Sequence, residues 1–258
     1  MGKSTGRSRR RAVLDVVVPA PDGGSQSRAT VHGLCEEALA LGSLLEMDCW
    51  ISSVLGQLWE QRFQAPPLQL ERVFVLGVPV AEQLARSGVD GARLVLQAIA
   101  CVDRGALGAR CAQLADEMGG EPLPDWARRR RRVRVSRAVA AGIRGDGEVV
   151  CLGVRGGGRP AHTLAVFVDE RQGGVAKHIH LLDSLEDWAQ DILGPHGALG
   201  APGVELTPAV AAERVRESIR RTDENPDALV EESVCTLRAL AIARADIRRA
   251  PEDAAWLN

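Results

Sequence analysis

The sequence predicts an α+β protein: a helical N-terminal domain followed by a four-stranded antiparallel meander that C-terminal helices cover. Apolar residues recur at helical spacing up to residue 119, at a period of two between 133 and 182, and at helical spacing again beyond that. The first change of period coincides with a Gly- and Pro-rich stretch at 119–124, which is typical of a domain boundary. The predicted organisation is a disordered basic tail at 1–28, a helical domain at 29–119, a linker with an arginine run at 120–132 and an α+β domain at 133–258.

The N-terminal helices are predicted from apolar stripes and the residues that interrupt them. Helical spacing begins at Ala29, and Pro79 is expected to open a new helix after Gly77, because proline favours the first helical position. The other predicted helices cover about 43–63, 90–103 and 107–118.

The C-terminal part alternates between strand and helix signals. Thr207-Pro208 and Asn225-Pro226 each combine a capping side chain with a proline at the first helical position. A further helix is expected from Asp183 or Ser184 to about 193. Strands are predicted at about 133–143, 148–155, 161–169 and 175–182, with connections short enough for an antiparallel meander, and the last two helices at about 208–222 and 226–249.

The charges are segregated along the chain. Residues 120–182 carry twelve basic and six acidic side chains, a net of +6, whereas residues 183–258 carry eight basic and fifteen acidic, a net of -7. Such blocks favour surfaces that attract one another or a partner, so we expect an unidentified protein partner. No window is apolar enough to span a bilayer, and the six cysteines form no Cys-x-x-Cys pair. We therefore expect a cytoplasmic protein with reduced thiols, without membrane contact and without a cofactor.

The hairpin at 162–180 holds the candidate site, formed by His162, Asp169, Lys177, His178 and His180. His178 and His180 lie two apart on a strand, so they share a face and could bind one metal ion. His162 is the candidate third ligand. It would lie on the same face as the pair if the turn loop had three residues, and on the opposite face if the loop had two or four. The apolar pattern favours the second case and two outward-facing histidines without metal.

The arginine run before the first strand is the candidate nucleic-acid site. Arginines can contact phosphates, yet no stacking aromatics are interleaved and no helix-turn-helix or zinc signature accompanies them. Because 30 of the 32 basic residues are arginine, which is typical of a GC-rich genome, the run is weak evidence for nucleic acid. The favoured explanation is a solvated linker or a charged edge strand, and the run could equally pair with the acidic C-terminal helices. The residues are Arg128, Arg129, Arg130, Arg131, Arg132, Arg134 and Arg137.

The hairpin and the segments after it resemble a family of uncharacterised actinobacterial proteins. The matching residues are His162, Thr163, Leu164, Asp169, Gly173, Gly174, Ala176 and Lys177, and the Thr207-Pro208-Ala209 helix start also fits. The resemblance covers roughly residues 120–245. It implies a helical N-terminal half and a small C-terminal sheet, but no reaction. This chain departs from the family pattern at Glu170-Arg171-Gln172 and at His178, so a family site there would be altered.

The sequence contains no recognisable arrangement of a nucleophile and a base, so catalytic activity is not the favoured expectation. We expect a non-catalytic interaction or regulatory protein. Two alternatives stay open: a nucleic-acid-associated protein that uses Arg128 to Arg137, and a metal-dependent enzyme centred on the 162–180 hairpin.

Overall fold

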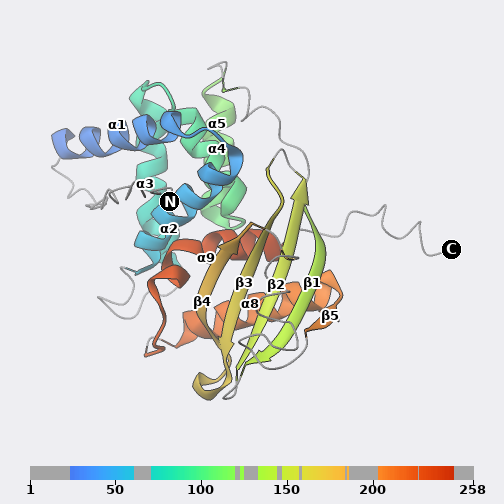
Figure 1. Cartoon of the computed structure of the whole chain (residues 1–258). Helices are drawn as coiled ribbons and strands as arrows, with labels where there is room; N and C mark the ends of the chain where they lie inside the picture. Colours follow the sequence, from blue (N-terminus) through green and yellow to red (C-terminus); the bar gives the residue numbers. More distant parts are fainter. Residues whose placement is uncertain are drawn as a thin grey trace, which may run out of the picture.

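The computed structural model describes residues 24–60, 71–119, 123–124, 133–143, 147–156, 159–183, 185, 203–225 and 227–246. In this part of the chain, seven α-helices accompany a five-stranded antiparallel sheet (Figure 1), which confirms the α+β class. The helices are α1 (Gly24–Ala40), α2 (Leu44–Glu60), α3 (Glu71–Ser87), α4 (Ala92–Val102), α5 (Ala106–Glu117), α8 (Pro208–Glu224) and α9 (Glu232–Ala245). The strands are β1 (Val133–Ile143), β2 (Gly147–Gly156), β3 (His162–Asp169), β4 (Val175–Leu182) and β5 (Val204–Leu206).

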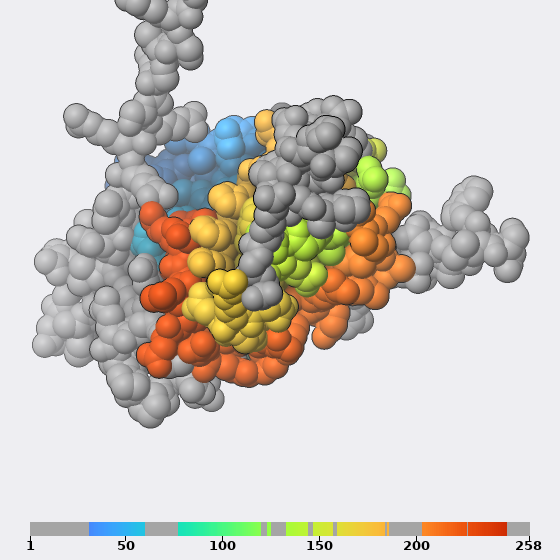
Figure 2. Space-filling view, turned by 60° about the horizontal axis from the view of Figure 1, so that its bottom comes forward, coloured from blue at the N-terminus to red at the C-terminus, as the bar shows by residue number. Residues whose placement is uncertain are grey.

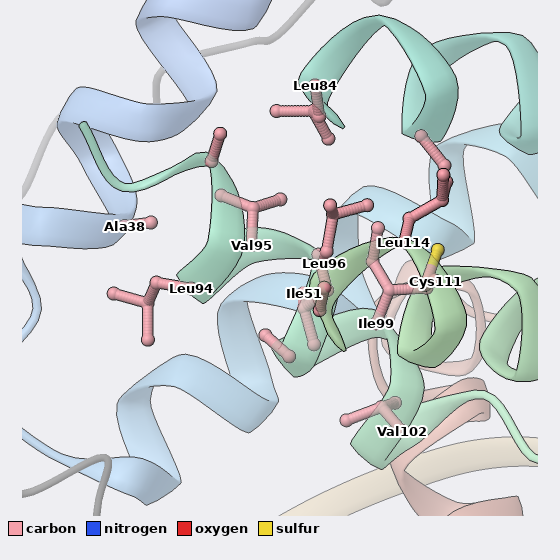
Figure 3. Packing of buried hydrophobic residues seen from close by; sticks show 14 of the residues in the cluster. Ala38, Ile51, Leu84, Leu94, Val95, Leu96, Ile99, Val102, Cys111 and Leu114 are labelled. Atoms are coloured by element: carbon pink, nitrogen blue, oxygen red, sulfur yellow. The ribbon is translucent and has the colours of Figure 1, made fainter. Parts of the chain in front are cut away.

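Helices α1 to α5 share one hydrophobic core around α4 (Figure 3). Helix α4 is apolar on most of its circumference, so it is buried among its neighbours rather than placed on the surface. Leu96 is fully buried, and Leu94, Val95 and Ile99 are also in the core.

Two details of the predicted helical half are wrong. Helix α1 begins at Gly24, inside the segment assigned to the tail. Pro79 lies within α3 instead of opening a new helix. An internal proline removes a helix hydrogen bond, but the complete burial of Ala81 and Leu84 on the following turns offsets that cost.

The sheet has the strand order β4-β3-β2-β1-β5. Four strands lie close to their predicted positions, but the sheet has five strands rather than four, because the three residues of β5 pair with Ala138–Ala140 of β1. One face packs against α8 and α9, and its residues include Ala138, Leu152, Leu164, Val166 and Ile179. We call this the inner face and the opposite one, which includes Val139, Cys151, Ala165 and Phe167, the outer face.

The two C-terminal helices begin differently from one another. Thr207 caps α8 as predicted: its side chain accepts a hydrogen bond from the amide of Val210, and Pro208 is the first helical residue. Asn225 does not begin the last helix, which was predicted from 226 but starts at Glu232. The backbone before α9 bonds to the hairpin instead, since Leu229 donates to the Gln172 side chain and Glu231 to the Lys177 carbonyl.

Helix α2 joins the helical group to the sheet by packing along α9. Along one face of α2, Asp48 bonds Arg244, the Ser52 hydroxyl accepts the Leu240 amide at 3.0 Å, and Gly56 lies against the Cys235 carbonyl. A Cβ on Gly56 would lie 2.0 Å from that carbonyl oxygen. The close approach therefore requires glycine at this crossing. We call this contact the α2–α9 seam.

None of the helices in the described ranges is both long and apolar enough to cross a membrane.

Candidate functional site

The hairpin between β3 and β4 has a specific turn. Asp169 caps a short 3-10 helix (Glu170–Gln172), and Gly173 and Gly174 follow with φ of 84° and 79°, values that favour glycine. The strand pairing also shifts between Phe167 and Val168, which leaves Lys177 as the extra residue of a bulge. Together the turn and the bulge determine which face each histidine occupies.

His178 and His180 lie on the outer face, and His162 lies on the inner face. Phe167 pairs with His178, and Ala165 pairs with His180. The two imidazoles are stacked, with ring centroids 5.9 Å apart. The Phe167 ring meets both edge-on, at 5.9 Å from His178 and 5.4 Å from His180. His180 is exposed, while His178 and Phe167 are half-buried. We call Phe167, His178 and His180 the histidine cluster.

The surroundings of His178 favour its uncharged imidazole. Burial is the main cause that lowers the pKa of His178, and the neighbouring His180 and Lys177 act in the same direction, while Glu231 opposes them. At neutral pH His178 is therefore an uncharged aromatic group rather than a cation.

Asp169 and Lys177 hold the turn. The Asp169 carboxylate accepts hydrogen bonds from the Arg171 amide and the Gln172 side chain, both at 3.0 Å, and from Lys177 at 3.3 Å. The Gln172 bond is the largest cause that lowers the pKa of Asp169. A carboxylate stabilised in its charged form is a poor proton acceptor at neutral pH.

The free edge of β4 is covered by the segments around α9. Thr222 accepts the Ala176 amide at 2.9 Å, and Ser233 accepts the Ile179 amide at 3.2 Å. With the Glu231–Lys177 bond, these contacts bond three backbone groups that could otherwise pair with another strand. Figure 2 shows the red segment leading into α9 beside the yellow hairpin. Leu229 in this segment is 77% exposed.

A three-histidine metal site does not form, because His162 and the pair His178 and His180 lie on opposite faces of the sheet. Among the described residues, no group of three or more His, Cys, Asp or Glu side chains is arranged to hold a metal ion.

His162 instead belongs to a buried cluster that the sequence did not reveal. The Asp48 carboxylate accepts hydrogen bonds from Arg159 at 2.5 and 3.0 Å and from Arg244 at 2.5 Å. Arg244 also approaches the His162 Nε2 atom at 3.4 Å. All four side chains are at most 6% exposed. This Asp48 cluster joins α2, the start of β3 and α9.

The hydrogen bonds identify the neutral tautomer of His162. Its Nδ1 atom lies 3.0 Å from the Pro160 carbonyl oxygen, which can only accept, so Nδ1 carries the proton and Nε2 accepts from Arg244. Burial is the main cause that lowers the pKa of His162, and Arg244 lowers it further. The sequence signal for this cluster was a charged residue inside an apolar stripe, as at Asp48 in α2 and Arg244 in α9.

A second polar group lies at the far end of the α2–α9 seam. The buried Trp59 indole donates to Asp223 at 2.9 Å, and Arg238 donates to the same carboxylate at 2.9 Å. The Arg238 guanidinium also lies 5.3 Å from the centre of the Trp59 ring. This group connects α2, α8 and α9.

A surface hollow of about 260 Å³ lies between the hairpin and α8. Both arginines of its lining are paired with lining carboxylates, since Arg214 bonds Glu148 at 2.8 Å and Arg221 bonds Glu217 at 2.9 Å. Arg221 also donates to the Gly173 carbonyl, so this contact attaches the turn to α8.

Only part of the predicted nucleic-acid site lies in the described ranges. Arg134 and Arg137 are on β1, whereas residues 128–132 lie outside those ranges. Arg134 pairs directly with Arg155 of β2, a residue that the sequence analysis did not single out. The signal available for Arg155 was its place at the end of a predicted strand in the basic block.

Comparisons with protein-family models, with curated proteins and with solved structures found no match to this chain.

Proposed function

We propose that this protein is a non-catalytic interaction protein that binds a protein partner at the hairpin side of the sheet. The observation that carries the proposal is the histidine cluster, in which two stacked imidazoles and Phe167 form a partly exposed aromatic surface. Aromatic side chains are enriched at protein interfaces, and their geometry provides contact area with few rotatable bonds.

The surroundings of the cluster support a binding role. Leu229 is 77% exposed, yet its backbone is bonded to Gln172, so a large apolar side chain is presented from an anchored segment. Large contiguous apolar patches mark interaction sites, whereas single exposed apolar residues are ordinary, so Leu229 adds to the histidine cluster and does not identify a site by itself. Two charged groups of the turn, Asp169 and Lys177, are paired with each other and are poorly placed for acid–base work.

The cellular setting in this proposal is the cytoplasm. All six cysteines have free thiols, and burial raises the pKa of Cys151 to about 12, so this thiol is unreactive at neutral pH.

Site-specific photocrosslinking tests the proposal. A photoreactive amino acid at position 180 or 229 should link the full-length protein to a discrete partner in its native cells. The same probe at position 39 is the control, because Leu39 is also an exposed leucine but lies on α1. The partner, once purified, should bind the Leu229→Asp and His180→Asp variants at least about tenfold more weakly, and the Leu39→Asp variant normally.

Two results would contradict the proposal. One is a crosslinking pattern that does not differ between positions 180, 229 and 39. The other is stoichiometric metal in the purified protein that the His178→Ala/His180→Ala variant lacks, since it would indicate a metal centre at the same histidines.

A further inference from the structure

Within the Asp48 cluster, His162 is the side chain whose type changes charge close to neutral pH. Both ring nitrogens are occupied in the neutral form, since Nδ1 donates to the Pro160 carbonyl at 3.0 Å and Nε2 accepts from Arg244 at 3.4 Å. A second proton would bind Nε2, and an imidazolium has no acceptor left. Protonation would therefore set two N–H donors and two positive charges against each other, where His162 and Arg244 are each 3% exposed.

The charged and titratable groups around His162 come from each element packed against it. Arg244 belongs to α9 and Arg159 to the connection between β2 and β3, and both are cations. Among the described residues, Asp48 of α2 is the carboxylate that acts on His162, and it already accepts three hydrogen bonds from the two arginines. Burial raises the pKa of the adjacent Cys49 thiol to about 11, so this thiol is neutral.

The C-terminal half of α9 depends on this cluster for its attachment. Its buried polar contacts are the Arg244–Asp48 pair and the bond from the Leu240 amide to Ser52, and Arg216 of α8 donates to the carbonyl of the last turn. Its buried apolar residues contribute little area, because those beyond Leu240 are small. They are Ala241, Ala243 and Ala245.

The N-terminal half of α9 is attached independently of the cluster. The Ser233 hydroxyl accepts the Ile179 amide of β4 at 3.2 Å, and Arg238 donates to Asp223 of α8 at 2.9 Å. The helix therefore stays fixed at its start when the contacts at its end are lost.

We propose that His162 is an acid-sensitive switch, whose protonation releases the C-terminal half of α9 from α2 and β3 while the sheet stays folded. Separation lets water hydrate the imidazolium and the Arg244 guanidinium, which repel each other in the closed form. The direction agrees with the surroundings of His162, since burial and Arg244 lower its pKa in the closed form. The open form takes up the proton more readily, so acid favours opening.

The size of the response follows from proton uptake by the open form. In water His162 has the ordinary histidine pKa of about 6.5. Between pH 7 and pH 5 the ratio of open to closed protein should therefore increase by up to about 25-fold.

Amide hydrogen exchange of the full-length protein, followed by mass spectrometry, tests the proposal. After correction for the pH dependence of the chemical step, exchange at 240–246 should become up to about 25-fold faster from pH 7 to pH 5, because a short released helix end does not keep its hydrogen bonds. At pH 5 this exchange should depend less steeply on urea than exchange in β2, since local opening exposes less surface than global unfolding.

The His162→Gln variant removes the titrating group, and its amide can still donate to Pro160 and accept from Arg244. It should lose the acid response at 240–246. His32→Gln is the matched control and should keep the response, because the His32 side chain is 61% exposed and lies on α1.

Two results with the natural protein alone would overturn the proposal: exchange at 240–246 that does not respond to pH, or exchange there with the same urea dependence as in β2 at pH 5. An acid response that persists in His162→Gln, or that disappears in His32→Gln, would overturn it as well.

Discussion

The Asp48 cluster makes a strong prediction for one substitution, Asp48→Asn. The change keeps the shape of the side chain and removes its charge. Two guanidinium groups, from Arg159 and Arg244, then stay in a site where each is at most 6% exposed. Removing one partner of a buried ion pair costs about 3–5 kcal/mol, because the remaining charge loses its compensation.

The expected loss is a large part of the stability of an ordinary domain, about 5–15 kcal/mol. It corresponds to at least a hundredfold increase in the unfolded fraction, since about 1.4 kcal/mol changes an equilibrium tenfold. Urea unfolding at neutral pH, followed by far-UV circular dichroism, measures it as a shift of the midpoint at constant slope. Asp116→Asn, at an exposed position on α5, should change the free energy by no more than about 0.5 kcal/mol.

The Arg244→Met variant gives a second check on the same reasoning. It leaves Asp48 paired with Arg159 through two hydrogen bonds, so one buried carboxylate then faces one buried guanidinium. Its cost should therefore be smaller than that of Asp48→Asn. Two results would contradict this reasoning: a free energy of unfolding for Asp48→Asn within about 1 kcal/mol of the natural protein, or a larger loss for Arg244→Met than for Asp48→Asn. Either would mean that the Asp48 carboxylate is not the shared counterion of the two arginines.

Three further predictions follow from single sites. The pKa of His162 is lower in the folded protein than in the unfolded chain, so the unfolded chain takes up the proton first as the pH falls. The free energy of unfolding should therefore be highest above about pH 6.5 and decrease towards pH 5 by up to about 1.4 kcal/mol per pH unit. The decrease should be less steep in the His162→Gln variant. Gly56→Ala should destabilise by about 1–3 kcal/mol in urea, because its Cβ meets the Cys235 carbonyl. Thr207→Ala should cost about 1 kcal/mol in thermal unfolding, through loss of the α8 cap; an unchanged melting temperature would contradict the capping role.

The sequence predicted the elements whose signal is local. Strands β1 to β4 follow from alternating residues between glycine-rich turns, and the α8 start follows from Thr207-Pro208. Strand β5 was missed because three residues have no readable period, and it forms only by pairing with β1. The start of α9 was misplaced because long-range bonds to Gln172 and Lys177 hold the preceding residues in extended backbone.

The candidate site, too, could be predicted from the sequence only in part. The outward placement of His178 and His180 could be predicted, because apolar residues alternate with them on β4. The predicted helix from 183 to 193 falls largely outside the described residues, so it stays a prediction. The Asp48 cluster could not be assembled from the sequence, since its members are separated by 111 and 196 positions along the chain. Only the folded arrangement of α2, β3 and α9 brings them together.

The α2–α9 seam explains why a chain with two predicted domains has polar groups buried between them. Apolar contact is non-directional, so it would allow α2 to slide along α9, whereas the bonds of Asp48 and Ser52 to α9 each require one register. Replacing Asp48, Arg159 and Arg244 together by Leu, Met and Met should therefore cost far less stability than Asp48→Asn alone, because no buried charge is left. Amide hydrogen exchange should nevertheless become faster across the C-terminal half of α9, because the Asp48 cluster no longer helps to fix its alignment with α2. Unchanged exchange in this triple variant would mean that the remaining contacts, among them the Ser52–Leu240 bond and the close approach at Gly56, determine the register without the Asp48 cluster.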